Sequence, residues 1–326
     1  MLKNILVANH NLLKAGGTET YTFTIIEELI KRGFNVEYFT FNKGVFSEKI
    51  ELDLKVRFMS KTCYDLIIAN HYTCVNYLFD RGFVIQTCHG IFPKRERPSK
   101  FADAYVAISD EVKNHLLKAG IQSEIIWNSI NVARFRIEKE VNAEIKTVLS
   151  LCHSQQANDL LRKVCKELDV SLIEQRKHEN PVWAVEDLIN KADIVVGLGR
   201  SAFEAMACGR PVIIFDHRHY YVACGDGYVR DFLLDSIKYN CSGRFLNRLY
   251  EPEEMINEFK KYNAQDSRYF REFAVEYLNI ANNLDRYLRI YEDRPTKKVT
   301  PLLRLGRYLV NMWFKLFYRI NYSVPK

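Results

Sequence analysis

Short hydrophobic runs alternate with longer segments of helical periodicity through the first half of the chain. The runs predict β-strands at residues 3–8, 35–41, 64–69, 83–88, 104–108 and 125–127. Between the first two runs, apolar residues recur at helical spacing up to Gly33, which is a typical helix stop. A second helix is predicted at 110–119. This order of strand, helix and strand indicates an α/β fold with a parallel sheet and right-handed crossovers.

The same pattern starts again in the second half of the chain. Strands are predicted at 147–151, 170–174, 193–196 and 212–215, and helices at 158–168, 185–192, 203–208, 253–262 and 266–292. Because residues 134–146 are charged and poorly patterned, we predict the domain boundary there. The expected division is a first domain at 1–140, a second at 141–292 and a tail at 293–326. The aromatic residues of the last helix are expected to pack against the body.

Residues 193–216 form the most informative stretch. A strand is followed by a glycine-containing turn at 197–201, a short helix and a second strand, so backbone N–H groups at the turn would face an anion, most plausibly a phosphate. The pattern Ser201-x-x-Glu204 also fits a capping box, in which Glu204 would bond the backbone of Ser201. Both interpretations are open at this point.

Polar residues follow several strands of the first half. Gly16 and Gly17 come after the first strand, where they would let a ligand approach the backbone, and Thr18 is placed to cap the helix. An ordinary tight loop is the alternative. His89 follows the strand at 83–88, at the edge of a parallel sheet where ligands bind. It is either a site residue or a structural histidine.

Charge and composition exclude several classes of function. The net charge is +7, and residues 295–326 carry seven basic and no acidic residues, so the rest of the chain is formally neutral. A general nucleic-acid-binding surface is therefore disfavoured. The eight cysteines form no CxxC pair, which favours buried free thiols over disulfides or a zinc site. We expect neither a signal peptide nor a membrane-spanning segment.

The tail mixes cations with aromatic and aliphatic residues between 297 and 326. This composition is typical of an amphipathic helix on an anionic membrane surface. The alternative is a helix packed on the body or against a partner subunit. We favour the membrane because no acidic residue balances the charge.

Three motifs resemble the GT-B glycosyltransferases, especially the group 1 retaining branch: GGTETYTFTIIEELIKRGFNVEYFT near the N-terminus, AISDEVKNHLLKAG with IWNSIN, and SAFEAMACGRPVI. The resemblance covers the chain up to about residue 292. It implies two Rossmann-like domains facing a cleft, with the basic amphipathic tail in addition. It also implies a nucleotide-sugar site on the second domain and acceptor contacts on the first.

Site residues follow from this resemblance. Glu204 would accept hydrogen bonds from the ribose, and Gly199, Arg200 and Ser201 would hold the donor diphosphate. Gly16 and Gly17 would lie against the diphosphate or the transferred sugar. His89 would bond a sugar hydroxyl or stabilise developing charge near the reacting sugar, and is the candidate catalytic residue.

The chain departs from the family pattern at two places. Val196 stands where group 1 enzymes usually carry a first glutamate, and the usual Gly-Arg and Lys after the first strand of the donor domain are missing. Arg176, Lys177 and Arg200 are the candidates to meet the phosphate charge instead. A GT-A enzyme and a dehydrogenase fit less well, because no convincing Asp-x-Asp or GxGxxG stands at a strand end.

We therefore expect a metal-independent, hexosyltransferase-like glycosyltransferase. It would use a UDP- or GDP-sugar as substrate, without a cofactor, and a glycan or lipid-linked acceptor in cell-surface polysaccharide or glycolipid synthesis. It would be cytoplasmic and peripheral at the inner face of the membrane, bound through 297–326. The alternatives are a sugar-nucleotide epimerase of the same fold and an inactive glycosyltransferase-like binding subunit, which Val196 keeps open.

Overall fold

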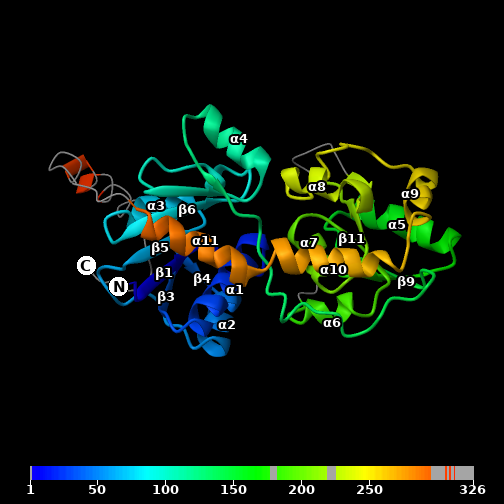
Figure 1. Ribbon diagram of the computed structural model, residues 1–326, viewed down its shortest axis with the longest axis horizontal. Helices are drawn as coiled ribbons and strands as arrows, with labels where there is room; N and C mark the ends of the chain where they lie inside the picture. The colour runs from blue at the N-terminus through cyan, green and yellow to red at the C-terminus, as the bar shows by residue number, and fades with distance from the viewer. Residues whose placement is uncertain are drawn as a thin grey trace. The chain divides into compact units, whose positions relative to one another are not determined.

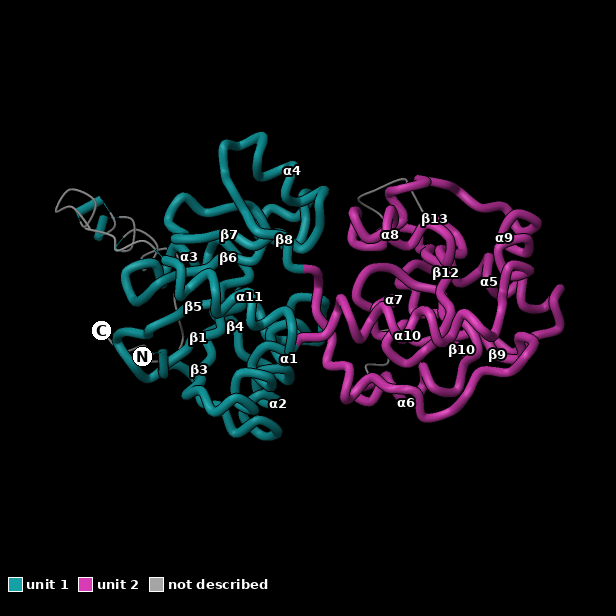
Figure 2. Tube along the Cα trace, viewed as in Figure 1, with its two compact units in different colours: residues 1–126, 281–326 teal, residues 127–280 magenta. Residues whose placement is uncertain are grey.

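The computed structural model describes residues 2–176, 182–218 and 225–294, together with residues 305, 306, 308, 309 and 312 of the tail. Contacts divide the chain into two compact units (Figure 2). Unit 1 comprises residues 1–126 and 281–326, and unit 2 comprises residues 127–280. Lys177, one of the candidates for phosphate binding, and most of the predicted tail lie outside the described residues.

Unit 1 is built on a six-stranded parallel sheet in the order β3-β1-β5-β6-β7-β8. The strands are β1 (Asn4–Ala8), β3 (Asn35–Phe39), β5 (Leu66–Ala69), β6 (Phe83–Cys88), β7 (Ala104–Ala107) and β8 (Glu124–Ile125). Its helices are α1 (Gly17–Lys31), α2 (Val45–Asp53), α3 (Tyr72–Leu78), α4 (Asp110–Lys118) and α11 (Ile280–Glu292), with a 3₁₀ turn η1 (Lys94–Glu96). A small parallel pair, β2 (Asn11–Leu12) and β4 (Asn42–Lys43), adds to these. The predicted strands of the first half are thus confirmed.

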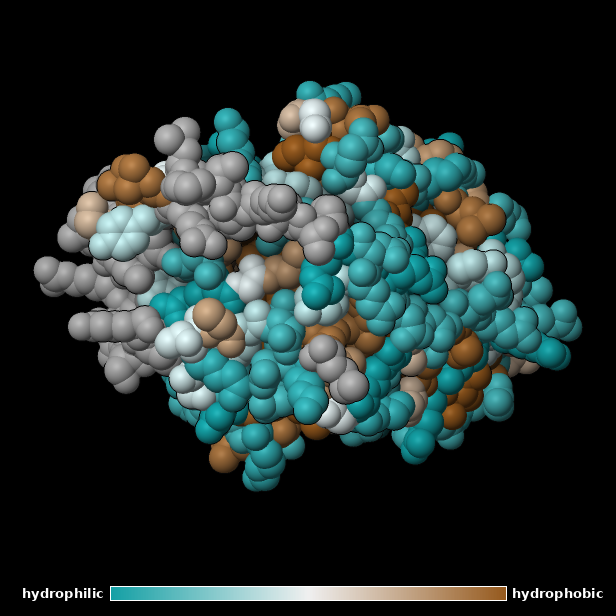
Figure 3. All heavy atoms as spheres, turned by 60° about the vertical axis from the view of Figure 1, so that its left-hand side comes forward, coloured by the Kyte–Doolittle hydropathy of each residue, from teal (hydrophilic) through white to brown (hydrophobic). Residues whose placement is uncertain are grey.

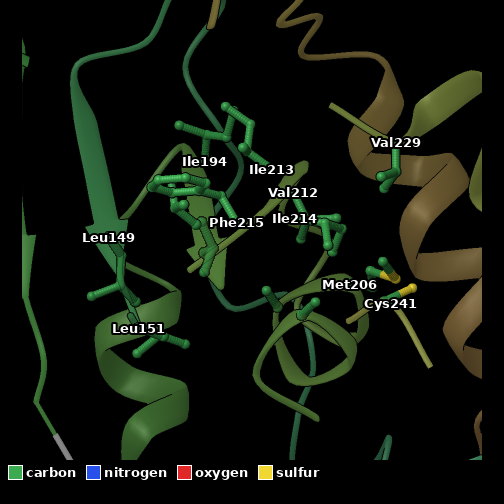
Figure 4. Close-up of a cluster of buried hydrophobic side chains, with 14 of the residues drawn as sticks. Leu149, Leu151, Ile194, Met206, Val212, Ile213, Ile214, Phe215, Val229 and Cys241 are labelled. Atoms are coloured by element: carbon green, nitrogen blue, oxygen red, sulfur yellow. The ribbon is translucent and has the colours of Figure 1, made fainter. Parts of the chain in front are cut away.

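Unit 2 contains a five-stranded sheet in the order β10-β9-β11-β12-β13, in which only β13 is antiparallel. The strands are β9 (Thr147–Ser150), β10 (Ser171–Glu174), β11 (Ile194–Gly197), β12 (Val212–Phe215) and β13 (Gly225–Tyr228). The helices are α5 (Gln155–Glu167), α6 (Val185–Ile189), α7 (Arg200–Ala207), α8 (Leu233–Ser236), α9 (Pro252–Phe259) and α10 (Asp266–Tyr277). Figure 4 shows part of the core, where strand residues such as Leu149, Ile194 and Ile213 gather with Met206 of α7.

Serine side chains fix the starts of two helices that follow strands. The hydroxyl of Ser109 accepts from the backbone N–H of Val112 at 3.3 Å, and that of Ser154 accepts from Ala157 at 3.1 Å. The helix α1 begins differently. Its N-cap is Gly16 and no side chain caps it, so the prediction that Thr18 caps this helix is wrong. Thr18 lies inside the first turn, where its hydroxyl instead donates to Glu19 at 3.1 Å.

The long helix predicted at 266–292 is two helices. The chain breaks between α10 and α11, where the backbone N–H of Ile130 donates to Leu278 at 2.7 Å and its carbonyl accepts from Ile280 at 3.0 Å. These bonds form a parallel bridge between Ile130 and Asn279, so the backbone there is extended rather than helical. The predicted division at 140/141 and 292/293 therefore differs from the contacts, which change units at 126/127 and 280/281.

Helix α11 belongs to unit 1 through a buried tyrosine. Tyr287 is fully buried, and its hydroxyl lies 2.8 Å from that of Tyr21 on α1 and 2.9 Å from that of Thr87 on β6. In Figure 1 the helix, in orange, lies across this sheet. Phe270 and Phe273 of α10 are buried in the core of unit 2 in the same way. The aromatic stripe thus packs against the body, as predicted, although Tyr277 is 43% exposed.

One face of the molecule and the cysteines of the described segments can be compared with the sequence predictions. On the face shown in Figure 3, small groups of hydrophobic side chains are separated by hydrophilic ones. Of the seven cysteines in the described segments, all are free thiols and all but Cys63 are buried. Within those segments no helix is both long enough and apolar enough to cross a bilayer.

The hydroxyl of Tyr287 should matter for the stability of unit 1. We expect Tyr287→Phe to lower the free energy of unfolding by about 1–3 kcal/mol, because the hydroxyls of Tyr21 and Thr87 lose a buried partner. Urea unfolding measures this. The control is Tyr291→Phe on the same helix, whose hydroxyl has no recorded bond among the described residues and should cost less than about 0.5 kcal/mol. An equal loss of unfolding free energy in the two variants would contradict a stabilising role for the hydrogen bonds of the Tyr287 hydroxyl.

Candidate functional site

In unit 2 the strand β11 ends in a tight turn that starts α7. Gly199 is the N-cap, with a φ of +56° that favours glycine, and no side chain caps the helix. Its own N–H donates to the carbonyl of Cys241 at 2.8 Å. The first helical residues are Arg200 and Ser201, so the predicted diphosphate residues stand together at one helix start. Such a start offers backbone N–H groups and a positive dipole end to an anion.

Arg200 and Glu204 form a buried ion pair along the first turn of α7. The Nε atom of Arg200 donates to Oε1 of Glu204 at 2.9 Å, and both residues are 8% exposed. A terminal nitrogen of Arg200 also donates to the carbonyl of Ser129 at 2.8 Å. Glu204 therefore does not form a capping box with Ser201, because the N-cap is Gly199. Arg200 is likewise not a solvated turn residue.

The arginine leaves Glu204 with one oxygen to offer a ligand. The pair uses Oε1, and among the described residues Oε2 of Glu204 has no recorded partner. A carboxylate that is held by a guanidinium on one side is fixed in orientation. This is the arrangement that a hydroxyl donor such as a ribose needs.

The two departures from the family pattern have structural consequences. Val196 lies in β11 and is fully buried, so nothing at this position can supply a carboxylate. In the loop after β9, the N–H groups of His153 and Ser154 donate to the carboxylate of Asp216 at 3.0 and 3.2 Å. An acidic side chain therefore occupies the two amides that immediately precede α5. Arg176, a candidate for phosphate binding, lies 3.4 Å from Glu174 in an ion pair.

In unit 1 the two glycines differ. A Cβ atom on Gly16 would overlap the carboxylate of Glu19, whereas a Cβ on Gly17 would meet nothing within 4 Å. A side chain at position 16 would therefore displace the Glu19 carboxylate, whereas one at position 17 would meet no contact. The side chains that contact Gly16 both come from the first turn of α1. They are the carboxylate of Glu19 and the hydroxyl of Thr20, which donates to the Gly16 carbonyl at 2.8 Å.

His89 follows β6 and is held by a buried chain of polar side chains. Its Nε2 atom lies 2.9 Å from Oδ1 of Asn70, whose amide nitrogen donates to Thr22 at 2.9 Å. Because Asn70 uses its amide group for Thr22, Oδ1 accepts the Nε2 proton of His89. The ring of Tyr21 on α1 packs edge-on at 5.0 Å. The structure thus brings His89 close to the first turns of α1.

Two further histidines lie at the same sheet edge, after β1 and β5. The backbone N–H of His10 donates to Nδ1 of His71 at 3.2 Å, and both side chains are buried. Burial lowers the pKa of His71 to about 3, with smaller contributions from its electrostatic interactions with His89, His10 and Arg95. Burial and Arg95 lower the pKa of His10 to about 4. Both are therefore neutral at pH 7 and serve as hydrogen-bonding groups rather than cations.

Glu96 is the residue for which the sequence gives no signal. A Cβ atom on Gly90 would lie 2.5 Å from Oε2 of Glu96, so this carboxyl is turned inward beside His89 and Gly90. Burial raises its pKa to about 7, and the negative charge of Glu19 adds to the effect. A group of this kind exchanges protons near neutral pH. It ends the short 3₁₀ turn η1 after β6, which is too short for a periodic pattern to indicate which side chains point inward.

Neither a protein-family profile nor a curated protein matches the chain, but solved structures do. TarM is 12% identical, with a TM-score of 0.57 over 90% of this chain and 99% of its own. The pneumococcal O-GlcNAc transferase GtfA, solved with UDP and GlcNAc, is 8% identical, with a TM-score of 0.54 over 91% and 100%. A protein assigned as a UDP-N-acetylglucosamine 2-epimerase from Listeria monocytogenes is 12% identical, with a TM-score of 0.55 over 92% and 100%.

These similarities define the fold. The chain has the GT-B fold, with two Rossmann-like domains, as its motifs predict. At 8–12% identity these structures show the fold but not the reaction. Membership of the retaining group 1 branch of glycosyltransferases stays a prediction. Because the fold is shared with a protein assigned as an epimerase, the reaction has to be argued from the residues of this chain.

The carboxyl of Glu96 should make stability depend on pH. Since its pKa is about 7 in the folded protein and about 4.5 unfolded, the native state holds the proton more tightly. The free energy of unfolding should therefore fall, relative to Glu96→Gln, as pH rises from about 4.5 to about 7, by at most about 3 kcal/mol. Urea unfolding at several pH values measures the difference. The contributions of His10 and His71 are common to both proteins and cancel. A difference that does not change with pH would contradict the inward placement.

Proposed function

We propose that the protein is a glycosyltransferase that moves a sugar from a nucleotide diphosphate to a glycan or lipid-linked acceptor. The single observation that carries the proposal is the start of α7, where an uncapped helix end adjoins the buried Arg200–Glu204 pair. The uncapped end suits a diphosphate, and the carboxylate suits a ribose. UDP or GDP would be the nucleotide.

In this proposal unit 2 holds the donor. Gly199, Arg200 and Ser201 bind the diphosphate, mainly through backbone N–H groups, because the guanidinium of Arg200 is already engaged with Glu204 and Ser129. Arg200 then acts chiefly by orienting Glu204 and by adding positive charge near the leaving group. The amides after β9 do not contribute, since Asp216 occupies them.

Unit 1 supplies the groups for the transferred sugar and the acceptor. His89 is the proposed catalytic residue, which bonds a sugar hydroxyl or stabilises developing charge. Gly16 and Gly17 approach the diphosphate or the sugar, and Gly17 has open space beside its Cα for such an approach. Val196 removes the carboxylate that group 1 enzymes use, so the donor sugar must be recognised by other groups. The reaction needs no metal in this proposal and serves the synthesis of a cell-surface polysaccharide or glycolipid.

We also propose that the tail binds an anionic membrane surface at the inner face of the cell membrane. Four residues of the tail that the structure describes, Leu305, Tyr308, Leu309 and Met312, are helical, and between 48% and 66% of each is exposed. Their spacing places them on one helix face. Seven basic residues and no acidic ones accompany this face between 295 and 326. An exposed apolar face with unbalanced positive charge suits the membrane interface.

The donor site is tested by Glu204→Gln. We expect the affinity for UDP or GDP to fall about tenfold to a hundredfold, because a hydrogen bond to a charged group is worth about 1.5–3 kcal/mol. Isothermal titration calorimetry with each nucleotide measures it. The control is Glu186→Gln, which weakens another arginine–glutamate pair of unit 2, to Arg134, and should leave the affinity unchanged. Equal nucleotide affinity in Glu204→Gln and the native protein would refute the assignment.

The reaction itself is tested by incubating the protein with UDP-, GDP- and dTDP-sugars, with and without candidate acceptors. Transfer to an acceptor supports the proposal. Conversion of the sugar nucleotide alone identifies an epimerase, and nucleotide binding without turnover identifies a binding subunit.

The membrane role is tested by removing residues 297–326. The full chain should sediment with phosphatidylglycerol vesicles but not with phosphatidylcholine vesicles, and the shortened chain should sediment with neither, because it loses the cations and the apolar face together. Nucleotide affinity should not change, since the cut lies beyond α11. Unchanged sedimentation of the shortened chain would rule the tail out as the anchor.

A further inference from the structure

The segment that follows His89 carries a cluster of cations. Residues 92–100 contain Lys94, Arg95, Arg97 and Lys100, all of them exposed. None of the four side chains has an ion pair or a hydrogen bond to the part of the chain that the structure describes. We call this segment, residues 92–100, the cationic loop.

Buried side chains hold the cationic loop in place. Gln86 of β6 is fully buried, and its amide group donates to the carbonyl of Arg97 at 2.8 Å while its oxygen accepts from the N–H of Ser99 at 2.7 Å. The hydroxyl of Tyr105 on β7 bonds the Ser99 carbonyl at 2.5 Å. These bonds come from two strands of the sheet. The cations are therefore presented from a fixed backbone rather than from a free linker.

The one acidic residue of the loop is withdrawn from this surface. Glu96 turns inward against Gly90 and is half-buried, and its pKa is raised to about 7, so at neutral pH it is only partly ionised. Glu96 therefore does little to neutralise its basic neighbours. The surface of the loop keeps the charge of its lysines and arginines.

The charge of the loop reaches the edge of the sheet where His89 lies. The loop follows His89 and Gly90 at the end of β6, and the contact of Glu96 with Gly90 holds it against that strand end. Arg95 also contributes to the lowered pKa of His10 and His71, which follow β1 and β5. His10, His71 and His89 all follow strands of this sheet, and Asn70 bonds His89 directly. The loop thus borders the polar edge that is proposed to receive the acceptor.

We propose that the cationic loop binds a phosphate or diphosphate group of the acceptor and so places the reacting hydroxyl of that acceptor at His89. The inference rests on the proposed function. Arginine side chains bind phosphate oxygens in pairs, and several cations together match a group with more than one negative charge. This site lies on unit 1, whereas the donor diphosphate site proposed at α7 lies on unit 2.

A bilayer surface fits the loop less well than a phosphate group. Phe92, at 41% exposed, is the one large hydrophobic residue of the loop that is exposed, and no apolar face accompanies the cations as it does in the tail. Interfacial binding needs apolar area in addition to charge. A phosphate group that enters between the loop and the histidines needs charge and hydrogen-bond donors, which this edge offers.

The test is a binding measurement on the full chain with saturating UDP present, so that the donor site is filled. The probes are farnesyl diphosphate, farnesol and inorganic pyrophosphate, titrated into the native protein and into the triple variant Lys94→Gln, Arg95→Gln, Arg97→Gln. We expect both diphosphates to bind the native protein and to bind the variant at least tenfold more weakly, whereas farnesol binds neither. Tighter binding of farnesyl diphosphate than of pyrophosphate would indicate a lipid-borne phosphate, and equal binding a phosphate alone.

Matched controls separate this site from general charge and from the donor site. The triple variant Lys3→Gln, Lys55→Gln, Lys118→Gln removes the same charge from exposed lysines of unit 1 and should bind both diphosphates like the native protein. The affinity for UDP should be the same in all three proteins. If the native protein fails to bind UDP, the proposed function fails, while the diphosphate titrations without UDP still test the loop.

Three results would overturn the proposal. The first is equal diphosphate binding by the native protein and the loop variant, including no binding by either. The second is a loss of UDP affinity in the loop variant, which would assign the cations to the donor. The third is a loss of sedimentation with phosphatidylglycerol vesicles while pyrophosphate binding is kept, which would assign them to the membrane.

Discussion

Two backbone hydrogen bonds at Ile130 decide how the C-terminal part of the chain is divided between the units. The N–H and the carbonyl of Ile130 bond Leu278 and Ile280, and this bridge prevents residues 278–279 from continuing the helix. The residues before the break pack into unit 2, and those after it pack on unit 1 through Tyr287. A strand-like contact of one residue thus sends the chain back to the unit where it began. Each unit is closed by a helix that is distant in sequence from its sheet.

Hydrogen bonds within the protein also distinguish two helix starts at the sheet edge of unit 2. In unit 2, Asp216 bonds the two amides that precede α5, and the hydroxyl of Ser154 caps that helix. The start of α7 has no side-chain cap, and the carboxylate beside it is fixed by Arg200. Since buried polar groups are costly without partners, an edge satisfied at one helix and uncapped at the next directs an anionic ligand to the second. This contrast supports the donor site more strongly than the Gly-containing turn does alone.

The sequence predicts the strands well because hydrophobic runs in a buried parallel sheet are hard to mistake. It fails where long-range contacts override a local pattern. The aromatic periodicity of residues 266–292 continues without interruption, yet Ile130 divides it into two helices. Thr18 fits the composition of a cap, but the helix begins one residue earlier, at Gly17, so the N-cap is Gly16 and Thr18 lies inside the first turn. The short helix α2 was not predicted, since its apolar positions are few.

In the candidate site, too, the sequence predicts residues that are close along the chain and misses contacts between distant ones. Gly199, Arg200, Ser201 and Glu204 stand within one helical turn, so a motif alone is enough to gather them. The pairing of Arg200 with Ser129 depends on a loop 71 residues away, and no spacing rule indicates it. His89 could be found from its place at a strand end. Glu96 could not, because its burial depends on Gly90 and on the fold of an irregular loop.

The net charge of the chain does not indicate where cations without a partner lie, whereas the pairing of each charge does. The chain outside the tail is formally neutral, and many of its cations are neutralised locally: Lys31 and Arg32 by Glu28, and Arg57 and Lys61 by Glu37. Glu37 is itself held ionised, since hydrogen bonds from Tyr64, Ser60 and Arg57 outweigh its burial and lower its pKa to about 2. In the cationic loop the balance is reversed, because the carboxyl of Glu96 is withdrawn and the cations stay exposed. An exposed cation without a partner costs the folded protein little free energy, because water solvates it. If its backbone is held in place, less conformational entropy is lost when an anion binds. A protein can therefore be neutral in sum and still present a strong anion site.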